Sequence, residues 1–330
     1  MKMRNKHLGF TLIELMISLA LGLIVVAAAI LLFLTGQKSV AMQKGVAELQ
    51  DNANFGLNYI TKDIRLTNLN VMEALINDQT SYGGVVLSSS ATEVKSNVYL
   101  ASPAFALDPS LLSKEGLTSN VLVSNNSDPA NFSAGGSDQL VIQYLPQYSL
   151  KTISGTEYYV GGFDCEGEEL KFKKSDGLQM VVQRYFLRSD DNKVSNENSP
   201  LALACDAGHY SINAPTAVVN YDGAGEIIMK RVDHFRVLLG VQFANGSLRY
   251  MPISAYKELT SVPRPRILSI QLGALVRSTQ SVGGDAVVKA DQTFQVLDQT
   301  VKVKTSSDPK YIRQVVSQTI ALRNALGERE

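Results

Sequence analysis

The sequence has no tryptophan, and it contains only two cysteines and three histidines among its 330 residues. The side chains that most often bind transition metals or act as nucleophiles are therefore scarce. Lys and Arg together number 31, and so do Asp and Glu, so the chain carries no formal net charge. This balance excludes a strong overall field toward nucleic acid or acidic substrates, although a local basic patch can exist within a neutral total.

Proline is absent from the first hundred residues, because the first proline is Pro103. Within this stretch, residues 15–34 form a run of twenty residues without a charge. As a helix this run would be about 30 Å long, which matches the hydrocarbon core of a bilayer. Lys2, Arg4 and Lys6 precede it, and such basic flanks predict a cytoplasmic N-terminus with the rest of the chain across the membrane.

A cleaved secretory signal is the alternative interpretation of the apolar run. Ala27 and Ala29 offer the small-residue pattern that signal peptidase cleaves. The run nevertheless continues past that pattern through residues 30–34, and its length exceeds the apolar region of an ordinary signal. The sequence therefore favours a retained membrane span over about residues 15–34.

Beyond the apolar run, hydrophobic residues recur three or four positions apart, which is the spacing of an amphipathic helix. They are Met42, Val46, Leu49, Ala53, Leu57, Ile60 and Ile64. We expect one helix from Phe10 to about Arg65, apolar in its first half and with one face to bury in its second. Two helices joined near Gly36 or Gly45 are the alternative, because glycine weakens helices.

One carboxylate, Glu14, lies at the start of the apolar run. An acidic side chain deep in a bilayer costs about 2.5–3.5 kcal/mol on insertion scales, so it is a functional candidate whose partner must be found. The alternative is that Glu14 lies at the headgroup boundary, where it remains solvated.

The residues around Glu14 carry a specific pattern. Gly9-Phe10-Thr11-Leu12-Ile13-Glu14 after a short basic leader resembles the type III signal of type IV pilins and of type II secretion pseudopilins. The resemblance implies that a prepilin peptidase cleaves after Gly9, removes the leader 1–9 and methylates the new amino terminus at Phe10. It also implies that Glu14 serves assembly by pairing with the terminal amine of a neighbouring subunit. Positions 10 and 14 share a helix face, so a pair within one chain is open as well.

The remaining residues, 66–330, form a β-rich head with no internal repeat. Short runs of β-branched and aromatic residues alternate with clusters of Gly, Ser, Asn and Asp. The predicted strands are 84–87, 94–100, 139–144, 157–160, 170–173, 180–187, 217–220, 226–243, 267–277, 293–303 and 312–323, with a short helix at 252–259. Alternation in 267–277 indicates strands with one covered face, so the sheet should be largely antiparallel. The predicted class is α+β, pilin-like, with the second half of the helix packed on this head.

Two cysteines, Cys165 and Cys205, lie in this head. If the head is periplasmic, a disulfide between them is favoured by the oxidising compartment, and two free buried thiols are the alternative. A structural zinc site is disfavoured, because His209 is the only histidine near either cysteine.

No residue pattern in the head predicts catalysis or a cofactor. A G-x-S-x-G nucleophile elbow is absent from the sequence, and His234 lies in a predicted strand. The polar loop 189–200 carries oxygen ligands of the kind calcium prefers, namely Asp190, Asp191, Asn192 and Glu197. Their spacing does not match an EF-hand, so we interpret the segment as a solvated loop and expect no metal site.

Four further segments resemble the PilW family of type IV pilus minor pilins. They are AELQDNANFGLNYITKDIRLTN, VDHFRVLLGV, PRILSIQLGALVRST and YIRQVVSQTIALRN. The resemblance implies an inner-membrane minor pilin with a periplasmic head that later enters the pilus, where it initiates or caps assembly and supports twitching motility, adhesion and DNA uptake. Its implied partners are the prepilin peptidase, other minor pilins, the major pilin, a tip adhesin, the inner-membrane assembly platform and the bilayer. Direct binding of nucleic acid is not expected. A J-type minor pseudopilin of type II secretion is the nearest alternative, and a membrane-anchored periplasmic enzyme is the other.

Overall fold

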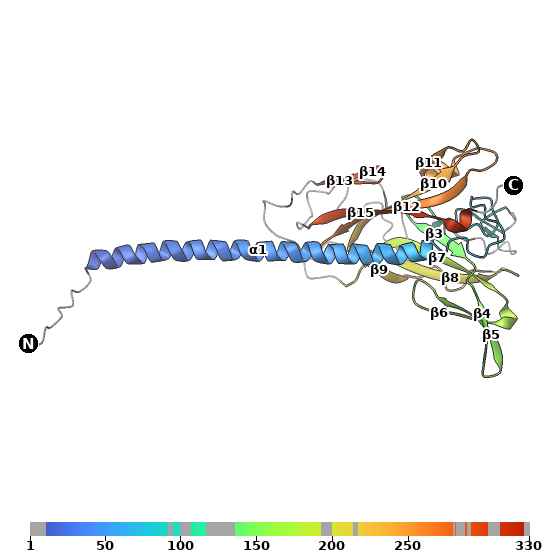
Figure 1. Ribbon diagram of the computed structural model, residues 1–330, viewed down its shortest axis with the longest axis horizontal. Coiled ribbons are helices and arrows are strands. Elements are labelled where there is room, and N and C mark those ends of the chain that lie inside the picture. The colour runs from blue at the N-terminus through green and yellow to red at the C-terminus, as the bar shows by residue number, and fades with distance from the viewer. Residues whose placement is uncertain are drawn as a thin grey trace, which may run out of the picture.

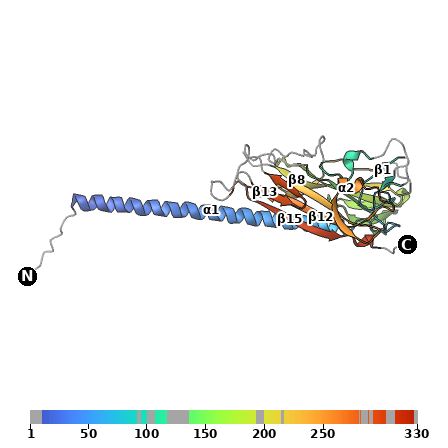
Figure 2. The ribbon, with the colours of Figure 1, turned by 90° about the horizontal axis from the view of Figure 1, so that it is seen from above.

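The computed structural model describes residues 11–91, 95–99, 107–116, 136–192, 200–213, 217–279, 281, 288, 292–302 and 311–326. A single long helix extends from a head built of β-strands (Figures 1 and 2). This helix, α1, runs without interruption over Leu12–Ile64. At about 1.5 Å per residue it is about 80 Å long, so the alternative of two helices joined at Gly36 or Gly45 is wrong.

Helix α1 ends where asparagines turn the chain. Asn68 and Asn70 adopt positive φ angles of 63° and 54°, a left-handed conformation that asparagine tolerates better than most residues. The Asn68 side chain also accepts a hydrogen bond from the Gly84 N–H and donates to the Glu73 carbonyl. These bonds fix the direction in which the chain leaves the helix and enters the head.

Two four-stranded antiparallel sheets make up most of the head. The first has the order β3-β7-β8-β9, with strands Leu140–Tyr144, Gln179–Ser189, Leu201–Ser211 and Glu226–Lys230. The second has the order β11-β10-β12-β15, with strands Leu248–Pro252, Val232–Gln242, Arg266–Arg277 and Arg313–Ala321. The chain passes from the first sheet to the second at Arg231, whose φ of 57° turns the backbone between β9 and β10.

Smaller elements surround the two sheets. A three-stranded antiparallel sheet contains β4 (Ser149–Ile153), β5 (Thr156–Phe163) and β6 (Glu169–Lys173). The others are the hairpin of β13 (Thr293–Val296) and β14 (Gln299–Lys302), the short parallel pair of β1 (Ser89–Ser90) and β2 (Val98–Tyr99), the helix α2 (Ile253–Lys257), and the 3-10 turns η1 (Pro109–Leu111), η2 (Lys174–Asp176) and η3 (Arg323–Ala325). The predicted class, a long N-terminal helix on a largely antiparallel head, is confirmed.

The second half of α1 supplies one wall of the main hydrophobic core. Its buried apolar residues, which join the inner faces of both large sheets, are Leu49, Ala53, Leu57, Ile60 and Ile64. The helix contacts β9 at the edge of the first sheet and β15 and β12 of the second. The helix therefore fills the space between two sheet edges, and Met42 and Val46 of the predicted stripe lie half-buried at the rim.

A side-chain amide closes the edge of the first sheet. Asn52 donates from Nδ2 to the carbonyl of Lys230 at 2.6 Å and accepts from the Lys230 N–H at 3.1 Å. Lys230 is the last residue of β9, the outer strand of that sheet. One side chain of α1 thus makes the two bonds that a neighbouring strand would make at this residue.

Several predicted strands differ from the structure. Residues 84–87 and 217–220 form only isolated bridges, which pair Val85 with Ile142 and Val219 with His209. Residues 226–243 divide into β9 and β10 at Arg231, and residues 293–303 fold back as the hairpin β13-β14. Four strands were not predicted, namely β1, β4, β8 and β11.

Gly56 allows α1 to approach the first sheet closely. A Cβ atom at Gly56 would lie 2.6 Å from Cε and 2.8 Å from Cβ of Met229, which belongs to β9. We expect Gly56→Ala to lower the free energy of unfolding by about 1 kcal/mol, since overpacking costs about 1–3 kcal/mol and helix propensity returns about 1. Thermal unfolding followed by circular dichroism measures the change.

Gly45 provides the matched control in the same helix. A Cβ there would meet Ser278 only at an ordinary 3.6 Å, so Gly45→Ala should leave stability unchanged or raise it by up to about 1 kcal/mol. Equal effects of the two substitutions would contradict a packing role for Gly56.

Candidate assembly site

The N-terminus of α1 is organised by a reciprocal pair of side chains. Thr11 is the N-cap residue, and its hydroxyl accepts a hydrogen bond from the Glu14 N–H at 3.3 Å. The Glu14 carboxylate in turn accepts from the N–H and the hydroxyl of Thr11, both at 2.9 Å. This is a capping box, in which two helix N–H groups without helical partners are satisfied. The cleavage and methylation positions predicted from the sequence, Gly9 and Phe10, lie outside the described residues.

The capping box gives Glu14 a partner that the sequence interpretation missed. The T-x-x-E spacing of Thr11 and Glu14 was the available signal, since it is the usual signature of such a box. Because both residues are exposed in the isolated chain, the carboxylate remains accessible to a further cationic partner.

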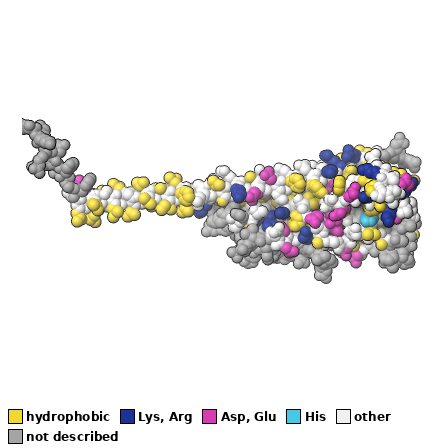
Figure 3. Space-filling model, turned by 90° about the horizontal axis from the view of Figure 1, so that it is seen from below, with side chains coloured by type: hydrophobic (Ala, Val, Ile, Leu, Met, Phe, Trp, Pro, Cys, Tyr) yellow, Lys and Arg dark blue, Asp and Glu magenta, His cyan; other side chains and the backbone are white. Residues whose placement is uncertain are grey.

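An apolar surface follows the cap along α1. All residues from Thr11 to Ala41 are exposed. In Figure 3 hydrophobic side chains cover most of this part of the helix, with an acidic side chain at its start and further charged ones nearer the head. By length and composition the helix can cross a membrane. An apolar surface of this length is not stable in water, so it requires lipid or other apolar helices around it.

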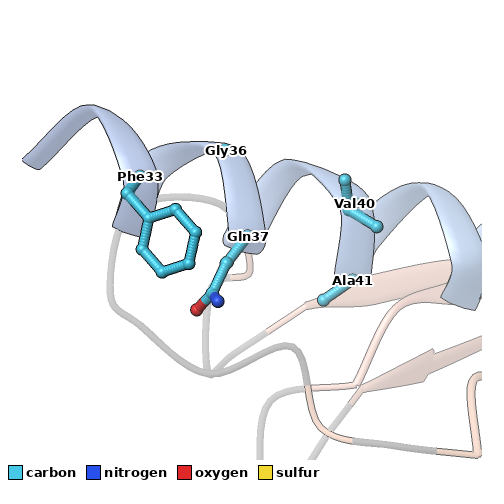
Figure 4. A pocket seen from close by; sticks show the side chains of 5 residues that line it. All are labelled: Phe33, Gly36, Gln37, Val40 and Ala41. Atoms are coloured by element: carbon cyan, nitrogen blue, oxygen red, sulfur yellow. The ribbon is translucent and has the colours of Figure 1, made fainter. Parts of the chain in front are cut away.

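A shallow apolar depression extends this surface toward the head. It is lined by Phe33, Gly36, Gln37, Val40 and Ala41, all on α1 (Figure 4). A Cβ atom at Gly36 would meet nothing within 4 Å, so glycine leaves a gap between its neighbours. The depression offers room for a small apolar group of another helix rather than a binding cavity for a polar ligand.

At the other end of α1, a carboxylate is buried against the first sheet. The Tyr185 hydroxyl donates to Asp63 Oδ2 at 3.1 Å, and Tyr185 itself is fully buried in β7. Burial raises the pKa of Asp63 to about 6, against a smaller lowering by the Tyr185 hydrogen bond. Asp63 therefore changes its charge near neutral pH, at the position where the helix joins the head.

The two cysteines lie beside this junction. The structure joins Cys165, in the turn after β5, to Cys205 of β8 in a disulfide, with their Cα atoms 6.1 Å apart. The Tyr59 hydroxyl of α1 donates to the Cys165 carbonyl at 3.0 Å. The helix, the three-stranded sheet and the first large sheet therefore meet at this pair.

Asp190 and His209, two of the residues considered for metal binding, pack against other side chains of the protein. Asp190 is buried and forms an ion pair with Arg231, while Asn192 donates its N–H to Asp190 at 3.0 Å. Glu197 lies outside the described residues. His209 packs on the Phe172 ring with centroids 4.6 Å apart. Within the described part of the chain, no group of three or more His, Cys, Asp or Glu residues could hold a metal ion.

His234, which the sequence places in a predicted strand, lies inside the head. Its Nε2 is 2.9 Å from Gln299 Oε1 and its Nδ1 is 3.5 Å from the Ser137 hydroxyl. Burial lowers the pKa of His234 to about 4, so it is neutral at physiological pH. Its surroundings are those of a buried strand residue.

Comparison with known protein families identifies two parts of the sequence. The family model described as "Type IV Pilus-assembly protein W" (PilW) matches residues 187–324, which run from the end of β7 to η3. The chain carries a PilW domain. A second model, "Prokaryotic N-terminal methylation motif", matches residues 4–30 and so includes the Gly9–Glu14 string. The PilW domain contains three of the four segments quoted above, and AELQDNANFGLNYITKDIRLTN precedes it.

Other comparisons add less. No curated protein matches the chain. Among solved structures, a type IV-like pilin from Thermus thermophilus aligns with this chain at 13% sequence identity and a TM-score of 0.27. The alignment covers 59% of this chain and 82% of the Thermus chain. An overlap this low supports no argument about fold or function. The resemblance of the chain to pilins therefore rests on the PilW domain and the methylation motif.

The pKa of Asp63 leads to a test of stability against pH. The pKa of Asp63 in the folded state lies above the ordinary value of about 3.9. The contribution of Asp63 to the free energy of unfolding is therefore fully present below pH 4 and is lost as the pH rises through about 6. The loss amounts to about 3 kcal/mol if nothing relaxes. We expect Asp63→Asn, which keeps an oxygen for Tyr185, to stabilise the protein at pH 8 and to have little effect at pH 4.

Thermal unfolding between pH 4 and pH 8 measures this difference. His234 contributes a slope of opposite sign, since its lowered pKa favours the folded state as the pH rises through 4 to 6.5. The contribution of Asp63 is therefore the difference in stability between the Asp63→Asn variant and the unmodified chain at each pH. A difference that does not change with pH would contradict this interpretation.

The cysteine pair leads to a second test. A disulfide that spans 40 positions stabilises the folded state by about 4 kcal/mol on the chain-entropy estimate. We expect the unreduced, unfolded protein to resist alkylation at Cys165 and Cys205, and the double change to alanine to lower the unfolding free energy by about 2–5 kcal/mol. Mass spectrometry that finds two alkyl groups without prior reduction would favour free thiols.

Proposed function

We propose that this chain is a minor pilin that initiates or caps assembly of a type IV pilus. It is made as an inner-membrane prepilin with a cytoplasmic leader and a periplasmic head, and a prepilin peptidase cleaves after Gly9 and methylates Phe10. One observation supports the proposal most: the methylation motif and the PilW domain occur in one chain, and the continuous 53-residue helix that begins within the motif packs against β9, β12 and β15 of that domain. Its partners would be the other minor pilins, the major pilin, a tip adhesin and the assembly platform.

The position of Glu14 supports an electrostatic role in assembly. Cleavage after Gly9 would remove three basic residues and create an amine at Phe10, which is close to the Glu14 carboxylate along the helix. In lipid, each charge is unfavourable unless a partner of opposite sign neutralises it. The carboxylate of one subunit would therefore align with the amine of its neighbour, and the Thr11 hydroxyl holds that carboxylate at the helix end.

The size of the head supports a rare position in the fibre. The described residues after α1 form a head with two large sheets and an additional small one that extends to one side (Figure 1). A head of this width repeated along a tightly packed shaft would collide with its neighbours. A location at or near the tip avoids this, and twitching motility, adhesion and DNA uptake would then depend on the chain through the pilus itself.

Substitutions at the helix N-terminus separate the charge of Glu14 from its capping role. Glu14→Gln keeps the capping box, which glutamine also forms, but removes the charge. Glu14→Ala removes both, and Thr11→Val removes the hydroxyl cap alone. We expect both Glu14 variants to be cleaved normally yet to enter pili at least tenfold less than the parent, and Thr11→Val to retain most of its incorporation.

Immunoblots of sheared pili against whole cells measure incorporation, and mass spectrometry of the mature chain identifies its N-terminus. Normal piliation of the Glu14→Gln strain would show that Glu14 only caps the helix and that its charge has no role in assembly. A mature N-terminus other than methylated Phe10 would contradict the processing step.

Deletion of the gene distinguishes the alternatives. A minor pilin predicts loss of surface pili with protein secretion intact, whereas a J-type pseudopilin predicts the reverse. If the chain is instead a membrane-anchored enzyme, the deletion should cause a phenotype that the Glu14 variants do not show.

A further inference from the structure

The edges of the two large sheets differ in how they are covered. Strand β9 is closed at Lys230 by Asn52, and β15 lies against α1. Strand β3 is bordered by the segment 84–86, where the Val86 N–H donates to the Val141 carbonyl at 2.9 Å. Strand β11 is the remaining edge, and no described residue pairs with its outer side.

The turn between β10 and β11 determines which backbone groups of β11 point outward. Phe243 and Ser247 form the hydrogen-bonded pair that closes this turn, since the Phe243 N–H donates to the Ser247 carbonyl at 3.0 Å. Hydrogen-bonded and non-bonded pairs alternate along an antiparallel ladder. Arg249 is therefore bonded to β10, whereas Leu248 and Tyr250 direct their N–H and C=O groups away from the sheet. These four backbone groups are available to a further strand.

The Tyr250 side chain leaves this edge open. Its ring lies over Gly240 of β10, where a Cβ atom would be 2.9 Å from Tyr250 Cε1. The Ser269 hydroxyl donates to the Tyr250 hydroxyl at 3.2 Å, which fixes the ring on the outer face of the sheet. Leu248 lies on the same face and is 69% exposed, and Tyr250 is 46% exposed. An added strand would therefore cover apolar surface as well as pair with the backbone.

One charge beside the edge indicates the chemistry of the partner. Arg249 lies between Leu248 and Tyr250 along β11, so its side chain points to the other face of the strand. It is exposed and forms no ion pair with a described residue. An added strand would place one side chain directly opposite Arg249, with the Cβ atoms about 5 Å apart. A carboxylate at that position would pair with the guanidinium.

A second copy of the chain fits this edge poorly. Two antiparallel β11 strands that pair about Arg249 would bring two guanidinium groups opposite each other, which is destabilising. Pairing about Tyr250 would place Leu248 opposite Pro252, which has no N–H to donate to the Leu248 carbonyl. Pairing about Leu248 would extend into the turn, because β11 begins at that residue. The edge therefore favours a different polypeptide.

We infer that β11 binds an extended strand of a different pilus subunit, with a carboxylate opposite Arg249. The inference rests on the proposed function, because it takes the partner from the same fibre. In Figure 1 β11 lies at the margin of the head, on the side opposite the small sheet and away from the apolar half of α1. The contact therefore joins one head to another and adds to the contacts that α1 makes.

Photo-cross-linking in the piliated bacterium tests this inference. A photoreactive benzoylphenylalanine replaces Tyr250, because the residue opposite it on an added strand would lie within about 5.5 Å. We expect an adduct with a different prepilin-type subunit, and mass spectrometry should find Asp or Glu within two residues of the cross-linked position. The same replacement at Phe163, which is 69% exposed on the small sheet, is the control and should give no such adduct.

Two pairs of variants separate the backbone contact from the side-chain contacts. Leu248→Pro removes an outward N–H that no described residue uses, whereas Leu248→Ala keeps it. We expect Leu248→Pro to lower the adduct yield at least tenfold and Leu248→Ala about two- to threefold, because an acceptor left unpaired in a contact weakens it by about 5- to 100-fold. Arg249→Glu should likewise reduce the yield more than Arg249→Gln. Thermal unfolding verifies that each variant folds, and the Arg249 pair decides if Leu248→Pro does not.

Three results would overturn the inference. Equal losses within each pair of variants would exclude the backbone and charge contacts, and adducts only between copies of this chain would exclude a different subunit. The absence of any adduct at Tyr250 would show that Arg249 and Pro252 only protect the edge from pairing. The amount of the parent chain in sheared pili from the same cultures tests the proposed function separately. Its presence there without an adduct contradicts only the strand contact, whereas its absence from pili contradicts the proposed function.

Discussion

The burial of one face of α1 between two sheet edges is the interaction on which the rest of the structure depends. The helix carries hydrophobic residues along its whole length, but the head covers only the second half, where Leu49, Ile60 and Ile64 are buried. The two sheets would otherwise each leave an open edge and a partly uncovered core. Helix and head therefore stabilise each other, and this shared core holds the first half of α1 outside the head.

A consequence is that the two halves of α1 depend on different partners. The second half is satisfied within its own chain, by the core, the Asn52 bonds and the Asp63–Tyr185 contact. The described residues do not cover the apolar surface of the first half, so this surface requires lipid or other helices around it. Assembly in this view needs no rearrangement of the head, because the surface that must be covered is already exposed.

The sequence predicts the helical part of the structure better than the sheets. The uncharged run and the three-to-four spacing depend on local periodicity, so the helix, its buried face and the position of Glu14 follow directly. Strand β8 was missed because its sequence LALACDAGHYS is rich in alanine and glycine and is buried on both faces, which removes the alternation. Gly208 is small for a tertiary reason, since a Cβ there would lie 2.7 Å from the Val219 carbonyl.

The Asn52 contact also affects how two copies of the chain can meet. An outer β-strand presents unsatisfied backbone groups to any other extended chain, and this is a common beginning of aggregation. The amide of Asn52 occupies both groups of Lys230, and the body of α1 blocks sideways approach to that part of β9. This border of the sheet is therefore closed at Lys230 to backbone pairing with a second copy of the chain.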